Sequence, residues 1–202
     1  VKQFVNEALS GSVLYWDELD NNSLRKATKS AFGIDGAPSF KLDDVHTILT
    51  FGMDFMNAEG SVTLASGWAK AKDPEQGGFV SKMFSVGPRI GLTSTNTDIH
   101  ISVKAGTEAQ LAYAVAKKLA TKKGYNGPAN GLLAGIDADK LLASTGADPK
   151  LVDQLVTELS SHTSVALPGG VEATNGSNSG ATATAALLIN EVAGNVGKSV
   201  LF

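Results

Sequence analysis

The chain contains no cysteine among its 202 residues. Disulfide bonds, thiolate metal sites, iron–sulfur ligation and cysteine nucleophiles are therefore excluded within it. No apolar run approaches the ~18 residues that a membrane-spanning helix requires. The sequence also has no basic stripe, and its net charge is −3, which argues against nucleic acid as a partner. A single nucleotide is not excluded, because backbone N–H groups alone can hold one.

Signatures of catalysis are missing as well. His46, His100 and His162 show no H-x-x-x-H spacing, and we expect them to be structural. No serine stands in a nucleophile elbow, so a hydrolase triad is not supported. No G-x-G-x-x-G follows the first predicted strand, and the late glycine-rich loop lacks the Gly-Lys-Ser/Thr ending of a phosphate-binding P-loop. We therefore nominate no catalytic residue and no metal ligand.

Apolar residues make up 43% of the chain, which is enough for a substantial core. Strand patterns and helix patterns alternate along it. The predicted strands lie at 12–16, 45–51, 80–86, 98–103, 164–170 and 199–202. The predicted helices lie at 1–9, 23–32, 60–72, 107–123, 137–145, 149–161 and 181–194. This alternation predicts an α/β fold in which a mostly parallel sheet carries helices on both faces.

The domain organisation follows from the two ends and from one unmatched segment. The chain starts at Val1 inside a helix-like pattern and stops in the apolar run "SVLF". We therefore expect residues 1–202 to form a single α/β domain that is a fragment of a larger subunit. Segment 125–163 is expected to be a helical insertion. The compartment does not follow from the chain itself.

Ligand sites in open α/β sheets lie beyond the carboxyl ends of the strands. Asp54 follows one predicted strand as part of Gly52-Met53-Asp54, and its carboxylate could accept from a base edge or from ribose hydroxyls. The alternative is a cap for the helix that follows, or a solvated turn residue. Arg89 follows the next strand and could hold a phosphate in a bidentate contact. Its alternative role is pairing with a surface carboxylate.

Three ordered segments resemble the large subunit of molybdopterin oxidoreductases: "LDDVHTILTFGMDF", "FSVGPRIGLTSTNTDIHISVKAGTEAQLAYAVAKKL" and "LLINEVAGNVGKSV". In that family one strand ends in a Gly-x-Asn-like turn, and a second ends in Asp-Pro-Arg followed by a Thr-and-Asp segment. A Pro-Gly-Thr-Asp turn then opens a helix, and a later helix ends in Gly-Asn-Ile/Val-Gly. The resemblance covers roughly residues 40–120 and 164–202.

The resemblance implies a Rossmann-like domain that holds the guanosine end of a molybdopterin guanine dinucleotide. Carried over by motif, the cofactor-facing residues would be Gly52, Asp54, Pro88, Arg89, Thr93, Asp98, Gly106 and Thr107.

The chain departs from the family pattern at several of these positions. The aspartate before Pro-Arg is Gly87 here, which removes a carboxylate suited to ribose or guanine N–H donors. The asparagine of the first turn is Asp54, and the Pro-Gly-Thr-Asp turn reads Ala105-Gly106-Thr107-Glu108. The cysteine-rich iron–sulfur segment and the part that supplies the metal's protein ligand are absent from this sequence.

Two functions follow from this balance, and a third is weaker. The first is a nucleotide-holding domain of a molybdopterin-dependent oxidoreductase whose electron-transfer chemistry is carried elsewhere in the parent. The second is a non-catalytic scaffold in a membrane-associated respiratory complex, because "LDDVHTILTFGMDFMNAEGS" looks closer to cofactor-free subunits of that kind. The third is an unrelated small-nucleotide enzyme, which would need a catalytic pair that the sequence does not show.

The resemblance also implies partners and a location. The expected partners are the rest of the parent chain and electron-transfer subunits, with no nucleic acid and no direct membrane insertion. The implied location is the periplasmic face of the bacterial inner membrane or the cytoplasm. Whether the chain belongs to an enzyme depends on the parent, since the domain alone is not expected to be catalytic.

Overall fold

The fold is described from a computed structural model that covers the whole chain except residues 1, 9, 14–21, 58–60 and 170–177. The strand predicted at 12–16 falls mainly in the gap at 14–21 and lies outside the described residues. Among the described residues, no helix is both long and apolar enough to cross a bilayer.

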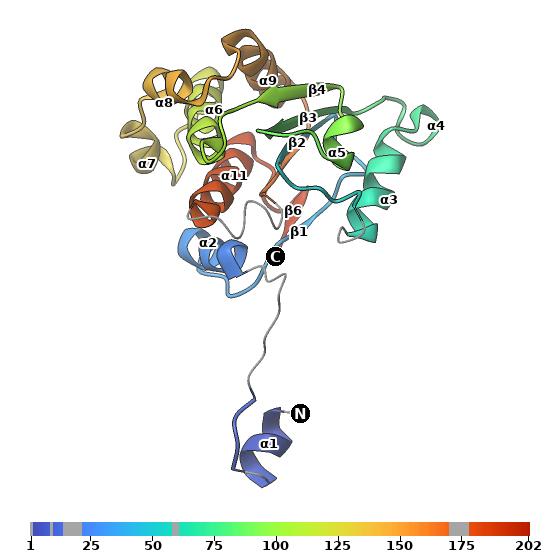
Figure 1. Cartoon of the computed structure of the whole chain (residues 1–202), viewed down its shortest axis with the longest axis vertical. Helices are drawn as coiled ribbons and strands as arrows, with labels where there is room; N and C mark the ends of the chain where they lie inside the picture. The colour runs from blue at the N-terminus through green and yellow to red at the C-terminus, as the bar shows by residue number, and fades with distance from the viewer. Residues whose placement is uncertain (1, 9, 14–21, 58–60, 170–177) are drawn as a thin grey trace.

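Helices are interspersed with strands along the chain (Figure 1). The helices are α1 Lys2–Ala8, α2 Asn22–Phe32, α3 Val62–Ala71, α4 Pro74–Gly77, α5 Leu92–Thr95, α6 Glu108–Lys123, α7 Asn130–Ala134, α8 Ala138–Thr145, α9 Pro149–Ser161 and α11 Ser179–Ala193. The strands are β1 Ser39–Phe40, β2 Thr47–Phe51, β3 Lys82–Gly87, β4 Ile99–Ser102, β5 Ser164–Leu167 and β6 Val200–Leu201.

Four parallel strands form the main sheet, in the order β4-β3-β2-β5. All five residues of β2 are buried, as its near-continuous apolar sequence requires in a strand covered on both faces. The strand predicted at 199–202 appears as β6, but it pairs antiparallel with β1 in a separate two-stranded sheet. The predicted α/β fold with a mostly parallel sheet and helices on both faces is confirmed.

Side chains alternate between the two faces of the sheet and feed two separate apolar clusters. Leu49, Phe84 and Ile101 point to the larger cluster, which includes residues of α6, α9 and α11. Ile48 and Met83 point to the other cluster, which packs against α3. Figure 1 shows the same layering, with α6 and α11 on one side of the sheet and α3 on the other.

Segment 125–163 contributes α7, α8 and α9 to the larger cluster. Leu133, Leu142, Leu155 and Leu159 of these helices are buried in the same cluster as the sheet residues. This segment, expected to be a helical insertion, is part of the connection from β4 to β5 and shares its core with the main sheet. We expect it to melt with the rest of the chain.

Local sequence signals mark several of the helix ends. Asp148 caps α9, because its carboxylate accepts a hydrogen bond from Lys150 N, and Pro149 occupies the first helical position. Gly124 ends α6 with φ +59°, a left-handed conformation that favours glycine. Thr107 stands at the N-cap of α6, but its hydroxyl donates to Lys104 O and caps no helix N–H.

Candidate functional site

The exit turns of three strands meet at the carboxyl edge of the sheet. Phe51 pairs with Val86, and Gly87 pairs with Ser102, so β2, β3 and β4 end side by side. Gly52 and Pro88 directly follow the first two of these strands. Gly106 and Thr107 lie between the third strand and α6. One edge of the sheet therefore carries most of the residues that the family resemblance nominates.

Asp54 connects two of these turns through its carboxylate. Oδ1 accepts a hydrogen bond from Thr93 N at 2.7 Å, and Oδ2 accepts one from Leu92 N at 3.2 Å. Both donors belong to α5, which follows β3, so the carboxylate caps a helix from a neighbouring loop. The expected alternative of a cap for the helix after Asp54 is wrong in its partner, because that helix, α3, is capped by Ser61.

The charge of Asp54 is stabilised by its surroundings. Burial raises the pKa of Asp54, but hydrogen bonds from Thr93 and Leu92 and the positive charge of Arg89 outweigh it. The pKa therefore lies below the ordinary value of an aspartate. Asp54 is ionised at neutral pH, and Arg89 is close enough to feel its charge.

A bond in the other direction completes the contact between the two turns. Met56 N donates to Thr93 Oγ1 at 3.0 Å, and Thr93 is buried. Gly91 makes room for the approach, because a Cβ at this position would stand 2.6 Å from Asp54 Oδ2. Gly91 was not singled out from the sequence. The signal that could have found it is a second glycine directly before the helix-starting run "LTST".

The amino termini of two long helices lie next to each other at the same edge. Asn178, the N-cap of α11, donates from Nδ2 to Gly106 O at 2.9 Å. Gly106 precedes α6, so this bond ties the start of α11 to the start of α6. Asn178 was not singled out from the sequence, because its partner lies 72 residues away.

Asp98 does not belong to this group of residues. It precedes β4 and accepts a hydrogen bond from Met83 N at 2.7 Å, near the start of β3. Its carboxylate also pairs with Lys72 Nζ at 2.6 Å. Met83 and Gly87 are four residues apart on an extended strand, which is roughly 13 Å. The motif assignment therefore places Asp98 at the wrong edge of the sheet, since it stands before its strand and not after it.

Ser85 and His100 form a polar contact between β3 and β4. Ser85 Oγ is 2.8 Å from His100 Nδ1 and 3.1 Å from Thr97 Oγ1. Ser85 is only 1% exposed, so a substrate does not reach this serine–histidine pair. The contact agrees with the structural role expected for His100.

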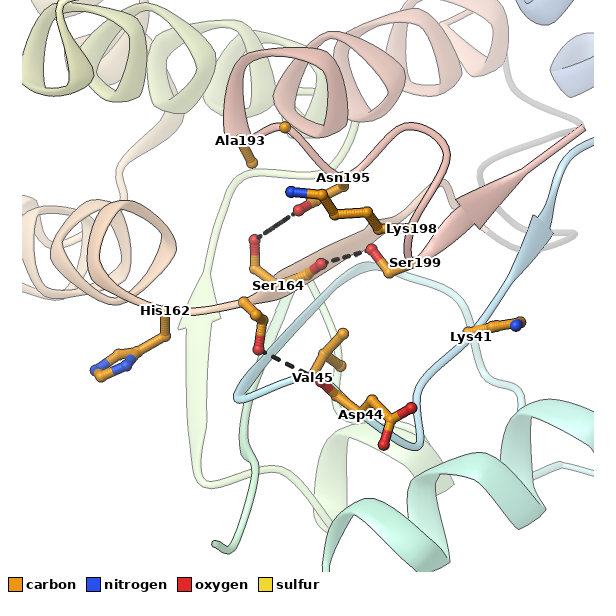
Figure 2. A pocket seen from close by; sticks show the side chains of 11 residues that line it. Lys41, Asp44, Val45, His162, Ser164, Ala193, Asn195, Lys198 and Ser199 are labelled. Atoms are coloured by element: carbon orange, nitrogen blue, oxygen red, sulfur yellow. Dashed lines mark hydrogen bonds between the residues drawn. The ribbon is translucent and has the colours of Figure 1, made fainter. Parts of the chain in front are cut away.

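A cavity of about 330 Å³ opens at the opposite, amino-terminal edge (Figure 2). Ser164 and Asn195 lie at its centre, and both are buried. Ser164 O accepts a hydrogen bond from Ser199 Oγ at 2.8 Å. The side chains of Lys41 and Lys198 extend in opposite directions in Figure 2. Because the charges diverge and the central polar groups bond one another, this cavity presents no convergent set of ligand groups.

The described part of the chain holds no cluster of three or more histidine or acidic side chains suited to a metal ion. The groups at the carboxyl edge that could bind a ligand are the Arg89 guanidinium, hydroxyls and the amino termini of α6 and α11.

Comparison with known proteins adds a fold relationship. No family model matches the chain, and no curated protein matches it. A solved structure does match, with a TM-score of 0.69 over 89% of this chain. It is acetylene hydratase from Pelobacter acetylenicus. The two sequences are 16% identical, and the aligned part covers 25% of that chain. The likeness therefore establishes a shared fold over about a quarter of the larger protein.

Proposed function

We propose that this chain is the nucleotide-holding domain of a molybdopterin-type oxidoreductase subunit. Its fold is shared with acetylene hydratase, a molybdenum- or tungsten-pterin enzyme, which supports a distant relationship to molybdopterin enzymes. In this proposal the carboxyl edge seats the guanosine end of a pterin guanine dinucleotide. The bound cofactor would supply the redox chemistry in other parts of the parent protein.

The observation that carries the proposal is the convergence of separate turns on one edge. The resemblance nominates the turns at Gly52, Pro88 and Gly106, which are far apart in the sequence. The strands β2, β3 and β4 bring all three to the carboxyl edge. Because ligands of open α/β sheets bind at this edge, the arrangement supports a nucleotide seat.

The residues at the edge fit a phosphate or sugar better than they fit guanine. Arg89 supplies a guanidinium, and the starts of α6 and α11 supply positive helix ends. The N–H donors of guanine call for a carboxylate, and the family's aspartate is Gly87 here. Among the described residues, a Cβ at Gly87 would meet Arg89 O at 3.7 Å, so a Cβ fits there without a clash.

Nucleotide binding by the chain tests this proposal directly. A ligand with a Kd of about 1 μM, added at about 100 μM, should add about 2.7 kcal/mol to the free energy of unfolding. We expect GMP to raise Tm and Arg89→Ala to reduce that rise. AMP is the matched control for the purine. Absence of a shift with millimolar GMP would sink the proposal for this chain.

One observation favours the second candidate function, a scaffold without cofactor. Both carboxylate oxygens of Asp54 are already bonded to the α5 backbone, and Gly87 offers no side chain. If the chain is such a scaffold, wild type should ignore GMP, and Gly87→Asp should introduce measurable binding. Molybdenum and released pterin, measured in the full-length parent, would separate the two functions independently.

A further inference from the structure

We propose that Asp54 is a positioning residue that holds the loop carrying Arg89, and that it does not contact a nucleotide. Its carboxylate joins the exit turn of β2 to the exit turn of β3. The inference rests on the proposed function, because it assigns the loop that Asp54 holds to the nucleotide seat. We call the hydrogen bonds that join residues 54–56 to Leu92 and Thr93 the clasp. The clasp can be measured without any ligand.

The two hydrogen bonds of the carboxylate are long-range contacts. Thr93 N and Leu92 N are 39 and 38 residues from Asp54. Oδ1 accepts from Thr93 N at 2.7 Å, and Oδ2 accepts from Leu92 N at 3.2 Å. An ionised acceptor makes such bonds about twice as strong as neutral ones. The carboxylate therefore has a defined internal partner on each oxygen.

The return bond from Met56 N to Thr93 Oγ1 makes the clasp reciprocal. A segment of three residues, 54–56, binds two consecutive residues of the other loop. Thr93 is 1% exposed, so losing this bond would take the Met56 donor from a buried hydroxyl. The loop between Gly87 and Thr93 is thus fixed at both ends, by β3 and by the clasp. Arg89 lies between these fixed points.

Gly91 is the steric counterpart of Asp54. Its φ of −98° is ordinary for any residue, so backbone freedom does not explain the glycine. A Cβ at this position would stand 2.6 Å from Asp54 Oδ2 and 3.2 Å from Asp54 Cγ. Those distances force the carboxylate away from its donors. We therefore expect Gly91→Ala to open the clasp while leaving Asp54 in the sequence.

Asp54 and Arg89 have different roles at the carboxyl edge of the sheet. The carboxylate oxygens of Asp54 accept hydrogen bonds from the protein backbone, whereas Arg89 is exposed and lies near the negative charge of Asp54. A guanidinium recognises acceptor groups, such as phosphate or carbonyl oxygens. We therefore expect the ligand group that Arg89 contacts to be a hydrogen-bond acceptor. Asp54 acts on it only by setting where Arg89 stands.

Amide hydrogen exchange at residues 91–95 tests the clasp without a ligand. We expect exchange to rise at least about tenfold in Asp54→Ala and in Gly91→Ala, with a smaller rise in Asp54→Asn, which keeps one acceptor oxygen. The matched controls are Gly36→Ala, where a Cβ meets nothing within 4 Å, and Asp137→Ala, which removes a cap on α8. Unchanged exchange in Asp54→Ala would overturn the proposal, even if that variant is less stable.

A pH profile distinguishes positioning by charge from simple packing. After correction for the intrinsic pH dependence of amide exchange, the protection of residues 91–95 in wild type should fall as Asp54 becomes protonated in acid, and this fall should be absent in Asp54→Asn. Protection that does not change with pH in wild type contradicts the role of the carboxylate.

GMP binding separates the fate of this inference from that of the proposed function. If wild type binds GMP, Asp54→Asn should weaken binding in step with the loosening of residues 91–95. Weaker binding with unchanged exchange would mean direct contact with the ligand, and the inference would be wrong. If wild type does not bind GMP, the proposed function fails. The exchange results then still decide whether Asp54 holds the loop.

Discussion

The side-chain amide of Asn190 bonds both backbone groups of Ala166. Nδ2 donates to Ala166 O at 2.7 Å, and Ala166 N donates to Oδ1 at 2.9 Å. Ala166 lies on β5, the edge strand of the main sheet, and both residues are fully buried. The amide on α11 therefore takes the place of a neighbouring strand and pairs groups that would otherwise be unsatisfied.

Replacing Asn190 by Ala should destabilise the protein strongly. The substitution leaves a buried N–H and a buried C=O unpaired, and it also removes one of the acceptors for Asn195 Nδ2. An unsatisfied buried group costs about 1–3 kcal/mol, so we expect a total loss of about 2–5 kcal/mol in the free energy of unfolding. Urea unfolding measures it. The exposed Asn126→Ala variant is the control, and equal midpoints for the two variants would contradict the prediction.

Leu159 tests whether segment 125–163 belongs to the common core. It is fully buried on α9, so Leu159→Ala should cost about 2–5 kcal/mol and lower the single unfolding midpoint of the whole chain. Leu132 lies in the same segment, on α7, but its side chain is 54% exposed, and Leu132→Ala should change stability little. The measurement is thermal or urea unfolding followed by two probes. Two separate transitions in Leu159→Ala would show that the segment folds as an independent insertion.

The sequence predicted best where local pattern and burial agree. The apolar run of β2 and the signals Asp148-Pro149 and Gly124 placed a strand, a helix start and a helix end correctly. The antiparallel pairing of β1 with β6 was not predicted, because two-residue strands 160 residues apart leave no periodic pattern.

The candidate site was predictable only in part, for a similar reason. Parallel strands gather their exit turns at one edge, and this rule anticipated that Gly52, Pro88 and Gly106 lie together. It could not anticipate that Asp54 spends its carboxylate on α5, since that depends on the space left by Gly91. Asp98 was assigned by motif, although its position before β4 already placed it at the amino edge.

Asp98 should make stability depend on pH in the acid range. Burial raises the pKa of Asp98, but the hydrogen bonds from Lys72 and Met83 N outweigh it, so the pKa lies below its ordinary value of 3.8. A carboxyl with a lowered pKa stabilises the fold above the unfolded pKa and loses that contribution as pH falls through the folded pKa. The ion pair is partly exposed, so its share should stay below about 1 kcal/mol.

The variant Asp98→Asn measures this contribution. We expect it to be less stable than wild type near neutral pH, and the difference to shrink as the pH falls below 3.8 and the wild-type carboxyl gains its proton. Urea midpoints near neutral pH and below pH 3.8 give the comparison. A difference that stays constant with pH would show that Asp98 acts through shape and not through charge.

His100 should lower stability as the solution turns mildly acidic. Burial lowers its pKa below the ordinary 6.5, and a hydrogen bond with the backbone of Gly87 opposes the shift only in part. The unfolded chain therefore binds a proton more readily than the folded chain, so stability falls as pH drops from about 6.5 toward the folded pKa.

The ring signal that disappears in His100→Gln identifies the residue in NMR spectra, and its titration midpoint should lie below 6.5. In the same variant the loss of stability between about pH 7 and pH 5 should be smaller than in wild type, because the titrating ring is gone while an amide can still bond to Ser85. A midpoint above 6.5 would mean that the charged ring is favoured in the fold, and the contact with Ser85 would then have to be read with His100 as a cation.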